Sequence, residues 1–204
     1  MPHLYQALTW TIDEPERPRE YVIHDNGQLL ANVSRVAVRR PDDAAMPYAN
    51  PHTHYDETRI VLCVAGPDRT PYFYLDRTND PMRPQPSFVV APNGGLIGSV
   101  VVETDGIKGA FQLLSGRRGS GYALRDARNE PVASILFPPR SSPGEEGTIT
   151  DRNDTELARH TIDHSPYNAG RRRRIVRLHH PLAEPLRTLV LASMIGVELM
   201  IPVT

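Results

Sequence analysis

The stretch that decides the fold is PLRTLVLASMIGVELMIPVT, residues 185–204, the most hydrophobic part of an otherwise polar chain. Pro185 suits the first turn of a helix, and the apolar run 186–201 follows it. At about 1.5 Å per residue this helix extends about 24 Å, short of the ~30 Å hydrocarbon core of a membrane. Glu198 lies within the run, and burying its carboxylate in lipid costs several kcal/mol. Because the run is apolar on nearly every side, we expect a helix surrounded by protein.

Four upstream segments share one design, in which a short alternating apolar run, a turn cluster and a second apolar run follow one another. Their turn clusters are DNG, PNGG, DARNEP and DRND, and Asn and Gly tolerate the positive φ angles of tight turns. Each segment therefore predicts a β-hairpin. The four hairpins are expected within residues 21–33, 87–100, 122–135 and 148–161.

Further short strands are expected on either side of these hairpins, which brings the tally to about ten to twelve. Turn signals recur every 8–12 residues or so, which is typical of a β-sandwich or barrel. Ala192, Ser193 and Gly196 form a strip of small residues on the helix, where strand backbones could approach closely. The additional strand candidates are residues 4–12, 34–40, 59–66, 71–76, 108–116 and 171–180.

Many hairpins followed by one wholly apolar helix resemble the Tubby-like superfamily, specifically its phospholipid scramblase and LURP-one-related family. The motifs that carry the resemblance are SFVVAPNGGLIGSV (87–100), YALRDARNEPVASI (122–135) and LVLASMIGVELMI (189–201). The first two are similar to hairpins of that family, and the third to its barrel-filling helix. The resemblance covers roughly residues 21–201.

The resemblance implies a mainly β fold, a closed antiparallel β-barrel of about twelve strands wrapped around the hydrophobic C-terminal helix. A single domain over residues 1–204 would form it. Because the helix fills such a barrel, no large interior pocket is expected, and a ligand should bind at a rim or on an outer face.

The chain departs from the family just before the helix. Scramblases carry an Asp-rich calcium loop there, whereas this chain has RLHHPLAEPLRT (177–188), with Glu184 as its single acidic residue. Calcium needs several oxygen ligands, so we expect neither a calcium-triggered activity nor any other cofactor. The Lys and Arg positions with which Tubby proteins hold phosphoinositides have no identifiable counterparts here.

Charge and cysteine content limit the class of protein. The 23 basic and 24 acidic residues nearly balance, so no bulk attraction to nucleic acid is implied. Cys63 is the single cysteine, which leaves no disulfide framework, and its apolar run predicts a buried strand residue. Residues 1–18 lack the basic and apolar regions of a secretory signal, so a cytoplasmic protein is expected.

A histidine-rich stretch, NPHTHYDE (50–57), is a candidate metal site. Alternate residues of a strand face one side, so His52, His54 and Asp56 could converge on a metal ion, with Glu57 beside them. The alternative is a polar loop between strands, and we expect no metal. A third histidine would have to come from His160, His164, His179 or His180, of which the last two are expected at the exposed start of the loop before the helix.

An arginine run, AGRRRRIVRL (169–178), is the candidate anion site, because guanidinium groups bind phosphates and lipid headgroups. We expect the run to be exposed; the alternative to a binding site is a solvated strand face or a charged edge. No aromatic residues interleave it, so single-stranded nucleic acid is not expected. The candidate residues are Arg171, Arg172, Arg173, Arg174 and Arg177, and Arg117, Arg118 and Arg125 join them if the barrel brings those hairpins together.

Signals for catalysis are few. The glycines of PNGGLIGS (92–99) lie in a hairpin, not between a strand and a helix, which disfavours a phosphate-binding loop. Asp76, Asp126 and Asp151 are expected to form Asx turns after strands. The first hypothesis is a non-enzymatic binding module of the LURP-one/scramblase type that engages anionic phospholipid or another phosphorylated ligand, cytoplasmic and peripheral at the membrane. The alternatives are a protein-interaction or structural domain, and an enzyme using His52 and His54.

Overall fold

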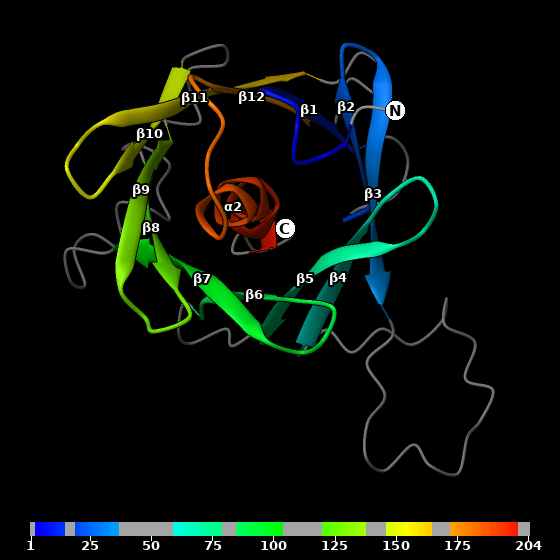
Figure 1. Ribbon diagram of the computed structural model, residues 1–204, viewed down its shortest axis with the longest axis horizontal. Helices are drawn as coiled ribbons and strands as arrows, with labels where there is room; N and C mark the ends of the chain where they lie inside the picture. The colour runs from blue at the N-terminus through cyan, green and yellow to red at the C-terminus, as the bar shows by residue number, and fades with distance from the viewer. Residues whose placement is uncertain are drawn as a thin grey trace, which may run out of the picture.

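The described residues form a closed barrel of twelve antiparallel strands around one helix, as predicted (Figure 1). The computed structural model describes residues 3–14, 19–36, 59–78, 85–103, 120–137, 146–164 and 172–199. The helix is α2 (Leu186–Leu199). The strands are β1 (Thr9–Asp13), β2 (Tyr21–Asp25), β3 (Gln28–Val36), β4 (Arg59–Ala65), β5 (Pro71–Thr78), β6 (Ser87–Val90), β7 (Leu96–Glu103), β8 (Ser120–Asp126), β9 (Pro131–Phe137), β10 (Glu146–Asp151), β11 (Glu156–His164) and β12 (Arg172–Leu178).

Each strand pairs with its neighbours in the sequence, and the pairing of β1 with β12 closes the barrel. In that closing pair Thr9 lies opposite Arg177 and Asp13 lies opposite Arg173. Closure leaves no unpaired strand edge among the twelve strands. The strand that carries the arginine run, β12, therefore has a paired strand on each side. The predicted alternative, a charged edge strand, is wrong.

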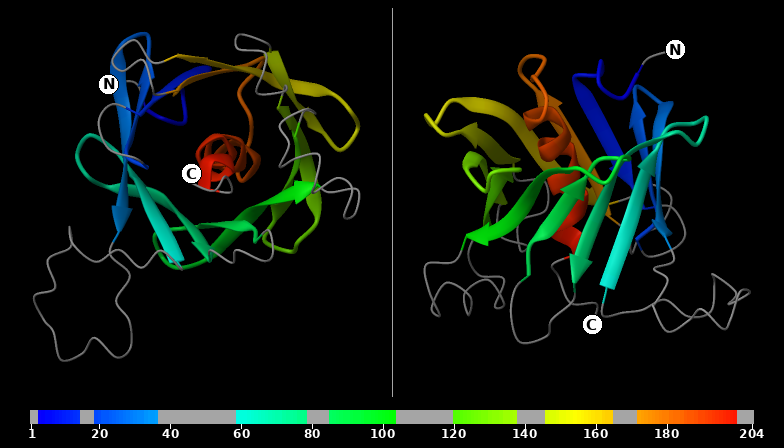
Figure 2. Two further views of the ribbon diagram at one scale, coloured as in Figure 1. Left: turned by 180° about the vertical axis from the view of Figure 1, so that it is seen from behind. Right: turned by 60° about the horizontal axis from the view of Figure 1, so that its bottom comes forward.

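The four predicted hairpins form, as β2–β3, β6–β7, β8–β9 and β10–β11. Two of their turns are Asx turns, as expected: the Asp126 carboxylate accepts hydrogen bonds from two backbone N–H groups of its turn, and Asp151 does the same. Asp76 is different, because it lies within β5 and pairs with Arg59 (Nε–Oδ1 2.9 Å) instead of opening a turn. We call the end of the barrel that carries these turns the hairpin end; in Figure 2, right, it is uppermost.

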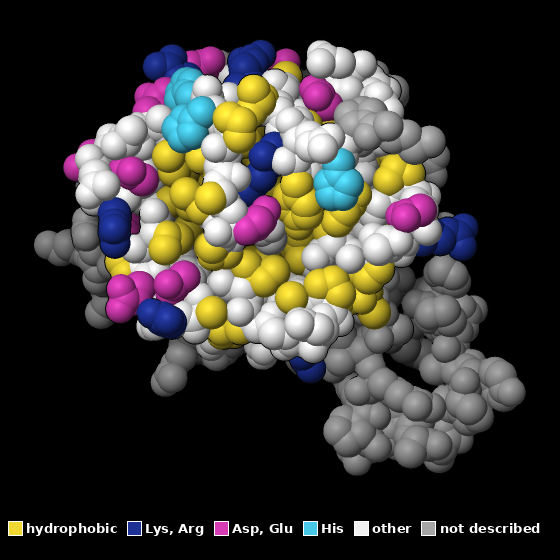
Figure 3. Space-filling view, viewed as in Figure 1, with side chains coloured by type: hydrophobic (Ala, Val, Ile, Leu, Met, Phe, Trp, Pro, Cys, Tyr) yellow, Lys and Arg dark blue, Asp and Glu magenta, His cyan; other side chains and the backbone are white. Residues whose placement is uncertain are grey.

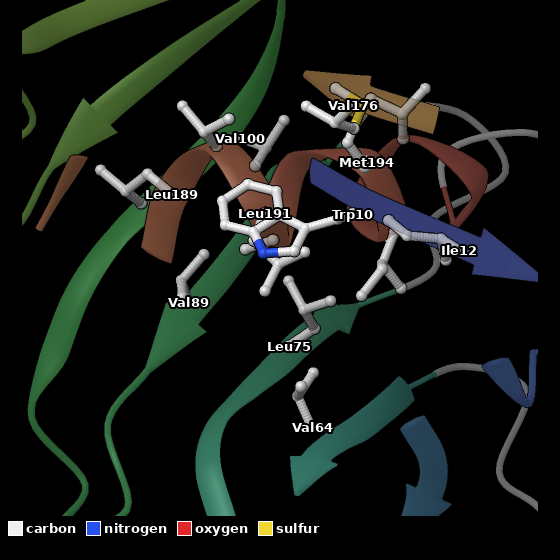
Figure 4. Close-up of a cluster of buried hydrophobic side chains, with 14 of the residues drawn as sticks. Trp10, Ile12, Val64, Leu75, Val89, Val100, Val176, Leu189, Leu191 and Met194 are labelled. Atoms are coloured by element: carbon white, nitrogen blue, oxygen red, sulfur yellow. The ribbon is translucent and has the colours of Figure 1, made fainter. Parts of the chain in front are cut away.

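The helix fills the barrel and supplies its core. Leu189, Leu191 and Met194 are completely buried, and side chains from β1, β4 to β7 and β12 surround them (Figure 4). The helix lies nearest to β5–β8, and the Trp10 side chain, also fully buried, comes from the opposite wall. Among the described residues no helix has the length and apolar character needed to cross a membrane. The C-terminal stretch is thus the core of the barrel.

The helix is fixed at the hairpin end, where it begins. The Glu184 carboxylate accepts hydrogen bonds from the hydroxyl (2.7 Å) and the backbone N–H (3.3 Å) of Thr188, which satisfies a free donor of the first turn. The Tyr5 hydroxyl lies 3.1 Å from the same Thr188 hydroxyl. Arg187 donates to the carbonyl of Ala7, with its guanidinium 5.8 Å from the centre of the Trp10 ring. Glu184 therefore caps the helix.

The surface of the hairpin end is apolar around the helix and charged at the rim. Figure 3 shows hydrophobic side chains between the start of the helix and the barrel wall, with acidic and basic side chains around them. Leu96, in the β6–β7 hairpin, is 45% exposed, and Leu8 is 41% exposed. Apolar side chains are therefore exposed at this end, with an acidic and a basic side chain among them (Figure 3).

Small residues permit close approach, as the strip on the helix predicts. A Cβ added to Gly196 would lie 3.4 Å from Ser87 of β6, whose hydroxyl donates to the Gly196 carbonyl (3.3 Å). Gly98 of β7 is tighter, because a Cβ there would lie 2.1 Å from the Arg125 carbonyl and 2.9 Å from the Leu189 side chain. Gly98 therefore allows β7 to lie between β8 and the helix.

Gly98→Ala is expected to lower the free energy of unfolding by about 2 kcal/mol, because the added methyl group must displace backbone. Gly121→Ala is the matched control, since its Cβ would meet nothing closer than the Glu103 carboxylate at 3.5 Å. Urea unfolding followed by circular dichroism measures both variants. Equal stability of the two variants would contradict the close packing of β7 against α2.

Candidate functional site

The arginine run does not form one exposed face. Successive residues of a strand point to opposite sides, and β12 divides the run accordingly. Arg174 points into the barrel and is 2% exposed, whereas Arg173 and Arg177 lie on the outer wall. The expectation that the whole run is exposed is therefore wrong for Arg174. Only the backbone of Arg172 is described, and Arg171 lies outside the described residues.

The two outer arginines have acidic partners. Arg173 donates from Nε and Nη2 to the two carboxylate oxygens of Asp13, at 2.8 Å each. Asp13 is only 1% exposed, so this is a partly buried, bidentate ion pair. Arg177 is exposed and lies 4.0 Å from Glu146. The Arg173–Asp13 pair ties β12 to β1, a role in barrel closure.

Of the other predicted arginines, the structure describes Arg125, which does not join the run. Arg125 lies on β8, four strands away from β12 in the barrel order, and donates to the Asn129 carbonyl (3.0 Å) in its own hairpin. Arg117 and Arg118 lie outside the described residues. The barrel therefore does not bring Arg125 and the run together.

Four arginines from separate segments lie instead at the end of the barrel opposite the hairpins. Arg174 enters from β12 and Arg77 from β5, both buried. Arg35 of β3 is half-buried and pairs with Leu62, which faces the interior. Arg19 comes from the turn between β1 and β2. We call this the arginine end; Figure 2, left, views the barrel from it.

The interior of the arginine end carries positive charge. Alternation places Asp13 and Asp163 on the outer wall. Glu14, the residue after β1, lies at this end and accepts a hydrogen bond from the backbone N–H of Arg19 (2.8 Å). Burial lowers the pKa of Arg77, while Tyr122 raises it and the like charge of Arg19 lowers it further. Arginine nevertheless keeps its proton at neutral pH. The described arginines at this end therefore supply the donors that an anion needs.

His160 is a second polar group in this half of the barrel. It is 1% exposed and lies beside the Phe137 ring, 4.3 Å between centroids. Its Nε2 is 3.1 Å from the Leu136 carbonyl, which can only accept, so Nε2 carries the proton. Burial lowers the pKa of His160 to about 4, the Leu136 hydrogen bond opposes the shift and the charge of Arg174 adds to it. His160 is therefore neutral at physiological pH and packs as part of the core.

The remaining polar candidates have different outcomes. His52, His54, Asp56 and Glu57 lie outside the described residues, so the structure does not test their convergence on a metal. Within the described ranges no group of three or more His, Cys, Asp or Glu residues is placed to hold a metal ion. His179 and His180 are exposed after β12, as predicted, and His179 lies 2.7 Å from Glu156.

Cys63 lies in β4, as predicted, but it is half-buried on the outer wall and not in the core. It pairs across the strands with Tyr74 of β5. Burial raises the pKa of its thiol, so the thiolate that a nucleophile needs is disfavoured.

Sequence reasoning missed Arg19, Arg35 and Arg77, although a signal for the last two exists. In PYFYLDRT of β5, Arg77 has the same parity as Phe73 and Leu75, which are fully buried. Arg35 likewise has the parity of Val33 in β3. A charged residue in phase with the apolar face of a strand is the pattern that identifies an inward-pointing arginine.

No protein-family model, no curated protein and no solved structure matches this chain. The resemblance to the scramblase and LURP-one-related family therefore stays a prediction.

Proposed function

We propose that the protein is a non-enzymatic binding module that engages a phosphate-bearing anionic ligand at the arginine end. The observation that supports this proposal is the position of four arginines from separate segments, Arg19, Arg35, Arg77 and Arg174, at the same end of a helix-filled barrel, with Arg19 within electrostatic range of Arg77. Guanidinium groups bind phosphate oxygens through paired hydrogen bonds as well as charge. The site lies at a rim of the barrel, which stays accessible to a ligand even though the helix fills the interior.

The ligand chemistry has two sources, a lipid headgroup and a soluble phosphate compound. For the first, the protein works in the cytoplasm and contacts the membrane surface peripherally, as in the LURP-one/scramblase type of module that the sequence resembles. The protein-interaction domain is the alternative, in which these arginines meet acidic side chains of a partner. The two ligand sources call for two arms in the experiment.

We expect the protein to co-sediment with vesicles containing phosphatidylserine more than with neutral vesicles, or to gain thermal stability from tripolyphosphate. Binding should weaken as salt rises, because exposed charges are screened beyond about 10 Å at 0.1 M. Replacing Arg19 and Arg35 by Gln should lower affinity at least tenfold, since each basic residue near an anionic surface contributes about 1 kcal/mol. The responding arm identifies the source of the phosphate.

The matched control replaces Arg128 and Arg152 by Gln, which removes the same charge from exposed turns of the hairpin end. Its affinity should equal that of the unaltered protein. Arg174 is unsuitable for this test, because a change there alters the core. If neither arm responds, or if both double variants lose affinity equally, the anion-binding proposal is wrong and the protein-interaction reading replaces it.

A further inference from the structure

Arg77 occupies a position in the barrel that usually takes an apolar side chain. It follows Phe73 and Leu75 on the inner face of β5 and is 4% exposed. Asp76 pairs with Phe88, so the neighbouring residue Arg77 lies next to Ser87 at the start of β6. Ser87 in turn contacts Gly196 in the last turn of the helix. The guanidinium therefore lies near the C-terminal end of α2, one residue before β5 ends.

Two nitrogens of the Arg77 guanidinium have no acceptor among the described residues. Its Nε and Nη1 atoms are buried without a hydrogen-bond partner among the described residues. Arg173 provides the contrast, because its guanidinium binds both oxygens of Asp13. A buried donor without a partner costs the full desolvation of that group, and more when it is charged. Because Arg77 in this state does not stabilise the barrel, we look for a functional role for it.

The surroundings of Arg77 do not supply the missing acceptor. The Ser87 hydroxyl donates to the Gly196 carbonyl, and Arg19 adds a like charge. The C-terminal end of the helix attracts a cation through its dipole, which favours an arginine at this position. The helix dipole therefore explains why a positive charge is favoured here. It does not explain why the Nε–H and Nη1–H groups have no acceptor.

We propose that Arg77 is the residue that coordinates the ligand's oxyanion, a single phosphate group inserted from the arginine end beside β5 and β6. This inference rests on the proposed function and deepens it, because it names the contact inside the barrel that a diffuse attraction to an anionic surface does not require. An oxyanion with two or more acceptor oxygens meets the unused donors and compensates the charge. Tyr122 provides a further hydroxyl within electrostatic range of the guanidinium.

The proposal predicts the direction in which Arg77→Met changes the melting temperature. This substitution keeps an extended side chain and removes the charge and the donors. In chloride buffer the variant should melt no lower than the unaltered protein, because it replaces an unsatisfied buried cation by an apolar group. Inorganic phosphate, compared with chloride at equal ionic strength, should raise the melting temperature of the unaltered protein. The variant should lose that response, with a fall in phosphate affinity of at least tenfold.

Arg128→Met is the matched control, at an exposed turn of the hairpin end, and should keep the full phosphate response. Arg77→Lys keeps the charge but loses the planar fork, so it should bind phosphate more weakly than arginine does. It also serves as the second variant should Arg77→Met fail to fold. A parallel arm uses vesicles containing phosphatidic acid, whose exposed phosphate group tests the lipid source with the same variants.

The outcomes separate this inference from the proposed function. If the unaltered protein responds to phosphate or to phosphatidic acid and Arg77→Met responds equally, Arg77 is not the coordinating residue, while the binding module stands. If the unaltered protein responds to neither probe, nor to the phosphatidylserine and tripolyphosphate arms, the proposed function fails and this inference fails with it. A variant that melts well below the unaltered protein in chloride, with its phosphate response intact, makes Arg77 a structural residue.

Discussion

A chain ended at Pro185 is expected to have no cooperative unfolding transition and to be insoluble or molten. The truncation removes α2, whose buried apolar side chains contact the inner wall. At about 1.5–3 kcal/mol for each large side chain, the loss exceeds the 5–15 kcal/mol or so that stabilises a typical domain. The lost side chains include Leu189, Val190, Leu191, Met194, Ile195, Val197 and Leu199. Differential scanning calorimetry and near-ultraviolet circular dichroism are the measurements.

A single-residue version of the test avoids shortening the chain. Met194→Asp puts a charge at a completely buried position of the helix and should lower stability by several kcal/mol. Met194→Leu conserves volume and should cost less than about 1.5 kcal/mol. A truncated chain that melts cooperatively, or an aspartate variant as stable as the leucine variant, would mean that the helix is not the core.

The fold could be predicted because its signals are local. The turn clusters beginning at Asp25, Pro92, Asp126 and Asp151 each mark one hairpin, and hairpin neighbours fix most of the strand order. The predicted strand at residues 34–40 was less accurate, because the structure continues β3 without a break to Val36. Where no turn residue intervenes, the local sequence pattern does not distinguish two strands from one long strand.

The candidate site could be predicted only in part, because it depends on which face of each strand points inward. The run that contains Arg173 and Arg174 reads as one basic cluster in the sequence, yet the barrel wall separates these two side chains. Arg77 stands alone in the sequence, and its significance comes from a missing acceptor, which only the assembled barrel reveals. Alternation with its buried neighbours could have predicted that Arg77 points inward. It could not have predicted that two of its donors lack an acceptor.

Two of the buried polar groups in this half of the barrel, His160 and Arg77, differ in how they are satisfied. A Cβ on Gly147 would lie 2.2 Å from His160 Nε2 and 2.3 Å from the Leu136 carbonyl, so a glycine there makes room for the histidine. His160 thus has a position prepared for it in the wall, with a hydrogen bond in its neutral form. Arg77 has no such partner. His160 Nδ1 also lacks a partner, but in the neutral ring it is an uncharged acceptor, so we interpret His160 as a core residue.

The structural role of His160 predicts a pH dependence of stability. Its pKa is about 4 in the folded protein and 6.5 when unperturbed, so the unfolded chain binds this proton first as pH falls. Stability should therefore decline from about pH 7 toward pH 4, where the contribution of this group levels off. The difference in pKa corresponds to about 3 kcal/mol, a large part of the stability of a typical domain.

His160→Gln should remove most of this decline, because glutamine does not titrate and its amide can still donate to the Leu136 carbonyl. Urea unfolding at a series of pH values from about 4 to about 7.5, a range that spans the two pKa values, measures the slope. His179→Gln is the control, since His179 is exposed beside Glu156 and its loss should leave the steep dependence in place. If the glutamine variant at position 160 keeps the full slope, the acid sensitivity arises elsewhere and His160 is not the buried neutral histidine that the barrel interior requires.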